Sequence, residues 1–128
     1  MTLELKLLVW STALALIQML IALLGAIAQV GLPALVGNRE NLPAFDGWAG
    51  RAQRAHRNML ESLVMFAALV LVVQVAGKSN AVTALGAQLF FWSRLAYAPA
   101  YVIGIPWLRT GLWGVSFVGL LQILLQLL

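Results

Sequence analysis

The chain has 128 residues, of which 62% are hydrophobic and only 9% are charged. An average soluble domain carries about 25% charged residues, so these charges cannot cover the surface of a small water-soluble monomer. The composition excludes a soluble domain, a disordered tail and a nucleic-acid-binding module, and it indicates an integral membrane protein. Because the chain has no cysteine and one histidine, it has no thiol nucleophile of its own and no expected metal site.

The first predicted helix is the apolar run from Leu3 to about Val30. It exceeds the roughly 20 residues that a helix needs to cross the hydrocarbon core. Glycine and proline then recur through residues 31–46, which we expect to form the longest loop. Asp46 ends this loop and is the expected N-cap of the next helix.

The second helix is expected over residues 47–76, with polar first turns and an almost purely apolar second half. A tight turn at 77–80 leads to a third helix over 81–103, and a short connection leads to a fourth over 107–128. A membrane β-barrel would need roughly ten-residue segments of alternating polarity, which this chain lacks. The sequence therefore predicts an all-α, four-helix membrane bundle that forms one domain, 1–128.

The basic residues are distributed unevenly between the two ends of these predicted spans. Both termini and the 77–80 turn share one side, which carries Lys6 and Lys78. The other side carries six arginines, at positions 39, 51, 54, 57, 94 and 109. Cytoplasmic loops of membrane proteins carry an excess of basic residues, so we expect the 31–57 and 104–109 regions to be cytoplasmic and the termini to lie opposite.

A polar stripe interrupts the second predicted helix. Its members Arg51, Arg54, Asn58 and Glu61 are spaced 3, 4 and 3 residues apart, which places them on one helix face. Arg57 lies beside the stripe and can reach Glu61 at i, i+4. A charge at bilayer depth costs about 2.5–3.5 kcal/mol, so these groups must face protein, water or a polar ligand. The surplus of arginine favours an anionic ligand, and the alternatives are anionic lipid or an ion-pair network that fixes helix packing.

A weaker polar pattern follows in the third predicted helix. Arg94, Tyr97 and Tyr101 fall at i, i+3 and i+7 and share one face, where packing or an interfacial aromatic belt is the alternative to a ligand site. Pro99 removes a backbone donor and is expected to kink this helix or to free a carbonyl. Arg109 begins the fourth helix at the same end as the stripe.

The stretch 51–61 reads RAQRAHRNMLE. It resembles the signature of the MAPEG family, the membrane-associated proteins in eicosanoid and glutathione metabolism. The run 54–58, RAHRN, followed by Glu61, resembles the microsomal prostaglandin E synthase branch residue for residue. The chain length, the four expected spans, the long first connection and the inferred orientation are also similar to those of the family.

The resemblance implies a homotrimer of four-helix bundles with glutathione bound between subunits near the cytoplasmic side. The similarity to members of the microsomal glutathione transferase and prostaglandin E synthase type implies that Glu61 binds the amino group of glutathione and that the arginines bind its carboxylates. Arg109 is the implied catalytic residue, since a guanidinium stabilises a thiolate and lowers the thiol pKa. The implied cofactor-binding residues are Arg54, Arg57, Asn58, Glu61, Tyr97 and Tyr101.

Two features depart from the glutathione-using members. Those members often carry basic residues at the cytoplasmic end of the first helix, where this chain has Gln29 and no positive charge. Arg39, in the following loop, could substitute only if the loop folds back. In addition, the spacing from Tyr101 to Arg109 does not align without a gap, and Thr110 stands where some relatives have serine.

The favoured function is therefore a glutathione-dependent transferase or peroxidase that acts on lipophilic electrophiles from the bilayer. The alternative is a MAPEG-fold membrane protein without glutathione chemistry, which is structural or binds lipid or another anion. A small multidrug transporter is a third possibility, but such proteins depend on an acidic residue deep in the first helix, and here the first helix has only Glu4, near its start. The expected partners are further copies of the chain, membrane lipids and a lipophilic substrate.

Overall fold

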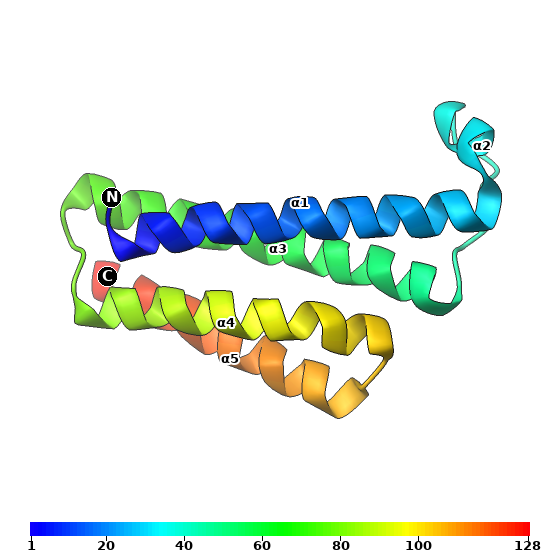
Figure 1. Cartoon of the computed structure of the whole chain (residues 1–128). Coiled ribbons are helices and arrows are strands. Elements are labelled where there is room, and N and C mark those ends of the chain that lie inside the picture. The colour runs from blue at the N-terminus through cyan, green and yellow to red at the C-terminus, as the bar shows by residue number, and fades with distance from the viewer.

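The computed structural model describes residues 1–128 and consists of helices without any strand, which confirms the all-α prediction (Figure 1). One short helix, α2 (Leu32–Val36), accompanies four long ones: α1 (Leu3–Val30), α3 (Gly47–Ala76), α4 (Ala81–Ile103) and α5 (Pro106–Leu127). By length and composition, α1, α3 and α5 can each cross a membrane. The expected fourth span, α4, is not among these three, and it contains the polar side chains of Thr83, Gln88, Ser93 and Arg94.

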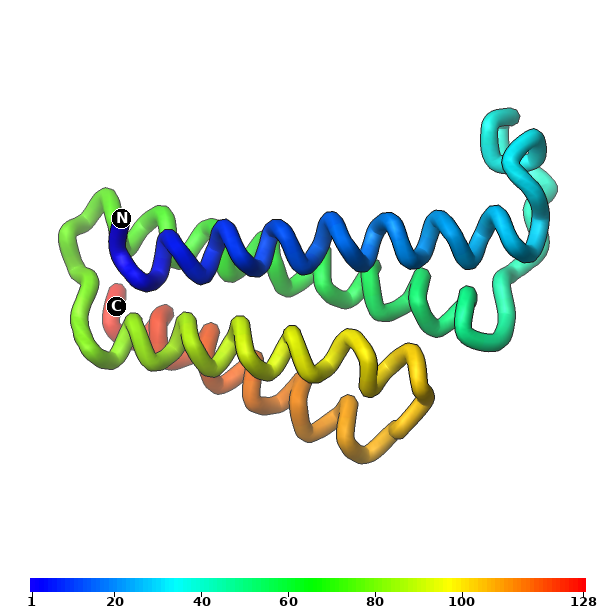
Figure 2. Tube along the Cα trace, viewed as in Figure 1, coloured from blue at the N-terminus to red at the C-terminus, as the bar shows by residue number.

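The long helices lie side by side, with α1 beside α3 and α4 beside α5 (Figure 2). Contacts of α4 with both α1 and α3 join the two pairs. Both chain termini lie at one end of the molecule, together with the turn between α3 and α4, whereas α2 lies at the opposite end (Figure 1). The α1–α3 pair extends past the α4–α5 pair at the α2 end (Figure 2).

The sequence predicted one long loop over residues 31–46. This prediction is wrong in part, because the region contains α2. Pro33 lies in the first turn of that helix, where proline's fixed φ and missing N–H are tolerated. Asp46 occupies the N-cap position of α3, but its side chain does not cap the helix. Its carboxylate Oδ1 instead accepts a hydrogen bond from Gln29 Nε2 at 2.9 Å, and this bond fastens the end of α1 to the start of α3.

Hydrogen bonds join the helices at the end that holds the termini. Glu4 of α1 is only 2% exposed, and its carboxylate accepts hydrogen bonds from the hydroxyls of Ser79 and Thr83. The Thr2 hydroxyl donates to Gln74 of α3 at 3.1 Å. In addition, the Asn80 side chain donates to Gln126 of α5 at 2.9 Å. All four long helices are therefore connected at this end by polar contacts between side chains.

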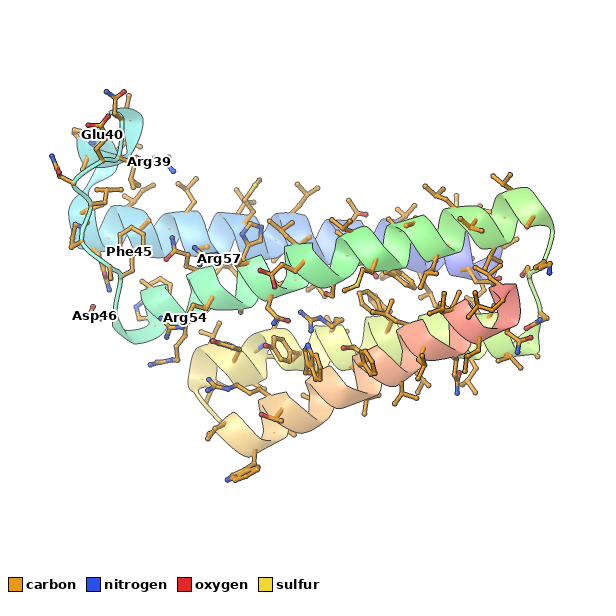
Figure 3. All side chains as sticks on the ribbon, turned by 180° about the vertical axis from the view of Figure 1, so that it is seen from behind. Arg39, Glu40, Phe45, Asp46, Arg54 and Arg57 are labelled. Atoms are coloured by element: carbon orange, nitrogen blue, oxygen red, sulfur yellow. The ribbon has the colours of Figure 1, made fainter.

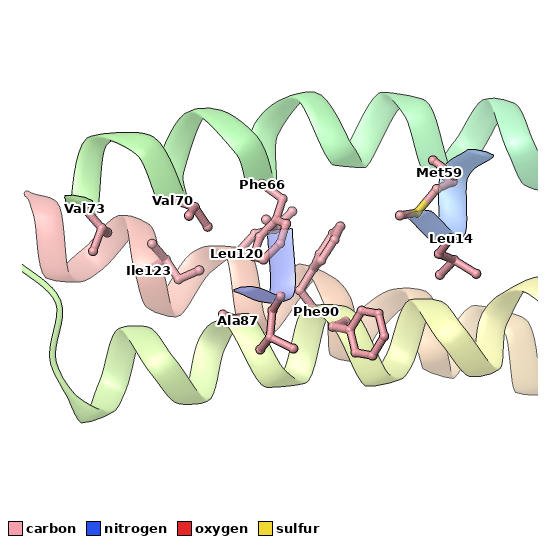
Figure 4. Close-up of a cluster of buried hydrophobic side chains, with 12 residues drawn as sticks. Leu14, Met59, Phe66, Val70, Val73, Ala87, Phe90, Leu120 and Ile123 are labelled. Atoms are coloured by element: carbon pink, nitrogen blue, oxygen red, sulfur yellow. The ribbon is translucent and has the colours of Figure 1, made fainter. Parts of the chain in front are cut away.

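The apolar core lies where α3, α4 and α5 meet α1 (Figure 4). At its centre, Phe66 of α3 and Phe90 of α4 stack with ring centroids 4.1 Å apart, and neither side chain is exposed. Val70, Val73 and Ile123 continue the core toward the termini. The outward surface is also apolar, as expected of helices that face lipid rather than water.

Two glycines let α4 and α5 approach until their backbones touch. A Cβ atom added to Gly119 would lie 2.5 Å from the carbonyl oxygen of Gly86, and one added to Gly86 would lie 2.7 Å from the carbonyl oxygen of Gly119. Small residues at helix contacts are typical of membrane proteins, because close approach increases van der Waals contact. Gly114, in the same helix α5, has open space around it.

We expect Gly119→Ala to lower the free energy of unfolding by about 1–3 kcal/mol, since the new methyl group must push two backbones apart. Gly114→Ala is the matched control and should cause no loss, because alanine favours helix more than glycine does. Thermal unfolding of the two purified variants in the same detergent measures the difference. Equal melting temperatures would show that the close contact contributes nothing to stability.

Candidate functional site

A buried arginine joins α4 to α3 in the middle of the molecule. Arg94 is 1% exposed, and its Nη2 donates a hydrogen bond of 2.7 Å to Oδ1 of Asn58. Its guanidinium lies over the ring of Tyr97, 4.2 Å from the centroid. The remaining nitrogens, Nε and Nη1, are buried without a hydrogen-bond partner. This group is therefore a buried cation with unused donors, which stabilises an acceptor or an anion placed beside it.

A second arginine–tyrosine pair lies next to the first. The guanidinium of Arg109, from α5, lies 4.5 Å from the ring centroid of Tyr101, and the Tyr97 and Tyr101 rings are 5.6 Å apart. Such cation–π contacts hold an arginine in place while its N–H donors stay available. The structure thus confirms that Arg94, Tyr97 and Tyr101 share one face of α4, and it brings Arg109 to that face.

Tyr97 and Arg109 line a cavity of about 240 Å³ between α3, α4 and α5. Its lining residues are Asn58, Tyr97, Arg109, Thr110 and Trp113. Three of the seven predicted site residues therefore line one cavity, and Tyr101 adjoins it through Arg109. The volume lies below the roughly 300–1,000 Å³ of typical small-molecule pockets.

The other three predicted residues, Arg54, Arg57 and Glu61, do not line this cavity. All three side chains are exposed along α3, and Figure 3 labels the two arginines on that helix. The arginine side chains that donate hydrogen bonds belong to positions 39, 51 and 94, and their acceptors are oxygens of Leu35, Val102 and Asn58. The i, i+4 spacing allows a hydrogen bond between Arg57 and Glu61, but the structure has none.

The stripe and the cavity are nevertheless continuous along α3. Asn58 belongs to both, since it lines the cavity and lies one helical turn from Arg54 and from Glu61. Arg51, the fourth member of the stripe, is instead tied to the end of α4, where its Nε donates to the carbonyl oxygen of Val102 at 2.7 Å. Arg51 thus caps a helix end and takes no part in the cavity.

The loop basic residue does not reach this region. Arg39 has a φ of 60° and donates a hydrogen bond to the carbonyl oxygen of Leu35 in α2. Among the helices, α2 contacts only α1, so the loop does not fold back over the cavity. Gln29, at the end of α1, is engaged with Asp46.

Sequence reasoning did not place Arg94, Thr110 or Trp113 among the site residues. The i, i+3, i+7 spacing with the tyrosines was a signal for Arg94, but the pattern alone did not distinguish a ligand site from packing. Trp113 follows Arg109 by four residues and therefore shares its face of α5. The Thr110 hydroxyl donates a hydrogen bond to the carbonyl oxygen of Pro106, one turn earlier in α5, at 2.9 Å. This bond fixes the side chain of Thr110 against its own helix.

Comparison with known families adds an independent finding. A family model described as "MAPEG family" matches residues 7–128. Comparison with curated proteins and with solved structures gives no significant match. The matched range includes the RAHRN run with Glu61, the Arg94–Asn58 contact and the cavity beside Arg109. The chain therefore belongs to the MAPEG family of membrane proteins.

Proposed function

We propose that this protein is a membrane-embedded, glutathione-dependent transferase or peroxidase that acts on lipophilic electrophiles. The observation that carries the proposal is the cavity where Asn58, Tyr97 and Arg109 meet, continuous with unpartnered charges on α3. The chain has no cysteine, so a reactive sulfur must come from a bound thiol. Glutathione, when bound, would supply a thiolate nucleophile.

The charges of the region fit the charges of glutathione. The tripeptide carries two carboxylates, one ammonium and one thiol, and α3 beside the cavity offers two exposed arginines, Arg54 and Arg57, and one exposed carboxylate, Glu61. Arg54 and Arg57 would bind the carboxylates by charge-assisted hydrogen bonds, and Glu61 would accept from the ammonium. Asn58, Tyr97 and Tyr101 would hold the peptide along the cavity. The free donors of Arg94, next to Asn58, support an anionic occupant at this depth.

Arg109 is the residue that we propose activates the thiol. Its guanidinium lines the cavity and is held over the Tyr101 ring, so its position is fixed before a ligand binds. A fixed cation beside a thiol favours the charged form and lowers the thiol pKa. The chemistry then needs an electrophile that partitions from the bilayer to the same cavity.

We further propose that the site is completed at the interfaces of a homotrimer of four-helix bundles. Arg54, Arg57 and Glu61 are exposed beside Leu60 and Val64 on the same helix. Exposed charges next to apolar side chains at membrane depth are costly in lipid, and a neighbouring subunit would cover them. In this arrangement α4 is the fourth span, the arginine-rich end is cytoplasmic, and the termini lie on the opposite side.

A second function is supported by the end of α1. There Gln29 binds Asp46 and no basic residue is present, unlike in many glutathione-using members. On this view the chain is a MAPEG-family membrane protein without glutathione chemistry, and the polar stripe fixes subunit packing or binds another anion. The two functions differ in what the stripe residues support, which is binding in the first and assembly in the second.

A glutathione titration of the detergent-purified protein separates these functions. We expect Arg54→Ala and Glu61→Ala each to weaken glutathione binding by roughly 10- to 100-fold, the size of one charge-assisted hydrogen bond. The oligomer should remain intact in both variants. Calorimetry measures binding, and gel filtration with light scattering measures assembly. Arg39→Ala, which removes an arginine remote from the cavity, is the charge-matched control for Arg54→Ala and should bind normally.

The opposite result would support the structural function. If wild-type protein does not bind millimolar glutathione while folded and oligomeric, the enzyme proposal is wrong. If Arg54→Ala and Glu61→Ala dissociate the oligomer or lower its melting temperature first, the stripe holds subunits together, because loss of one partner leaves a charge without compensation.

The role of Arg109 has a separate test. We expect Arg109→Ala to retain glutathione affinity within about threefold while turnover with an electrophile such as 1-chloro-2,4-dinitrobenzene falls by two orders of magnitude or more. The ultraviolet absorbance of the glutathione thiolate in the bound state should fall in parallel. Joint loss of binding and turnover would assign Arg109 to cofactor binding rather than to activation.

A further inference from the structure

The connection between α1 and α3, residues 31–46, forms an arm that leaves the bundle sideways. Its helix α2 contacts only α1 among the helices, and it projects from the end of α1 away from the α4–α5 pair (Figure 1). The 28 residues of α1 span about 42 Å. This length exceeds the roughly 30 Å hydrocarbon core and matches the roughly 40–45 Å of a bilayer with its headgroups. The arm, which follows α1 directly, therefore lies at headgroup level.

Side chains at this end of the molecule agree with that depth. Trp48 and Trp107 lie in the first turns of α3 and α5, and both are exposed. Tryptophan is enriched where the hydrocarbon core meets the headgroups. In the arm itself, α2 exposes the apolar side chains of Leu32 and Val36, and polar residues follow at 38–41. Such a segment, apolar on one part and polar on the next, is suited to lie in the membrane surface.

The arm contains a hollow of about 310 Å³ of its own. It is lined by one cationic, one anionic, two amide and two apolar side chains: Arg39, Glu40, Asn38, Asn41, Ala34 and Leu42. Figure 3 labels Arg39 and Glu40 on the arm. None of these residues lines the cavity beside Arg109. The hollow is therefore a separate polar site, formed by consecutive residues at headgroup level.

The cation of the hollow is held in place by the backbone of α2. Arg39 has a φ of 60°, a left-handed conformation that is uncommon for residues other than glycine. Its Nε donates a hydrogen bond of 2.6 Å to the carbonyl oxygen of Leu35, in the last turn of α2. This bond uses one of the five N–H donors of the guanidinium, so both terminal nitrogens stay available. An arginine held in this way can bind a phosphate by two parallel hydrogen bonds.

The anion of the hollow distinguishes it from a simple phosphate site. Glu40 directly follows Arg39 and is exposed, and the Arg39 side chain is bonded to Leu35 rather than to this carboxylate. A carboxylate in the wall repels a ligand that is only anionic. A cation and a carboxylate that are side by side but not bonded to each other instead complement a ligand with both a phosphate and an ammonium group.

We propose that the hollow binds the headgroup of phosphatidylethanolamine from the surrounding leaflet. Arg39 donates to the phosphate, Glu40 accepts from the primary ammonium, and the amides of Asn38 and Asn41 supply further hydrogen bonds. The apolar side chains of α2 contact the acyl chains. Phosphatidylcholine carries the same phosphate, but its quaternary ammonium has no N–H to donate, so the carboxylate selects between the two lipids. The proposal does not depend on glutathione chemistry.

The test compares two lipids that differ only in the methyl groups of the ammonium. Dioleoyl phosphatidylethanolamine and dioleoyl phosphatidylcholine are titrated against the delipidated protein in detergent. The readout is displacement of a phosphatidylethanolamine with a fluorescent acyl chain, followed by anisotropy. We expect the wild-type protein to bind the ethanolamine lipid about three- to tenfold more tightly, the effect of one hydrogen bond. Glu40→Gln should bind the two lipids equally. Arg39→Gln should weaken both about equally, because both carry the phosphate.

Lys78→Gln is the control for loss of one positive charge, since Lys78 is exposed in the turn at the opposite end, and it should bind both lipids as the wild type does. Equal affinity of the two lipids for the wild-type protein would overturn the proposal, as would a preference that survives in Glu40→Gln. Tighter binding of dioleoyl phosphatidylglycerol than of the ethanolamine lipid would also overturn it, because the hollow would then select a net negative headgroup. Glu40 is exposed, so its substitution leaves the helix packing intact and the comparison remains decisive.

Discussion

The contact between Arg94 and Asn58 is the interaction on which the polar half of this molecule depends. A guanidinium that is almost fully buried among helices has few available partners. That of Arg94 donates a hydrogen bond to Asn58 and lies over the Tyr97 ring. That contact fixes the rotation of α4 relative to α3. The rotation in turn determines that Tyr97 and Tyr101 face α5 rather than lipid, and that Arg109 has a ring to lie against.

The same low-polarity surroundings explain how the charges are divided. The buried charged side chains of Glu4 and Arg94 each have a hydrogen-bond partner inside the chain, whereas Arg54, Arg57 and Glu61 are exposed and make no hydrogen bond within it. A solvated surface would tolerate this arrangement, but the middle of a membrane would not. The division is therefore understandable if a single chain is an incomplete unit, whose exposed charges are matched by a ligand and a neighbouring copy.

Much of the fold follows from the order of apolar and breaking residues. The bounds of the long helices could be predicted because glycine, proline and Asn80 mark their ends, and the spacing of Arg94, Tyr97 and Tyr101 correctly gave one shared face. Helix α2 was missed because five residues carry too little periodicity to distinguish a short helix from a loop. The cavity itself was beyond prediction, since Thr110 and Trp113 reach it only through the packing of α5 on α4, which depends on Gly86 and Gly119. The resemblance of residues 51–61 identified the family, but the sequence could not show that Arg51 would leave the stripe to bind Val102.

The hydrogen bonds around Glu4 make the two ends of the molecule differ in how their helices are joined. At the end with the termini, hydrogen bonds between side chains connect all four long helices. At the other end, the α1–α3 pair projects past the α4–α5 pair (Figure 2). At that end hydrogen bonds join α1 to α3 through Gln29 and Asp46, and α3 to α4 through Arg51, but none joins α5 to another helix. The start of α5, which borders the cavity, is therefore held by the Arg109–Tyr101 contact rather than by hydrogen bonds, at a distance along the bundle from the core around Phe66 and Phe90.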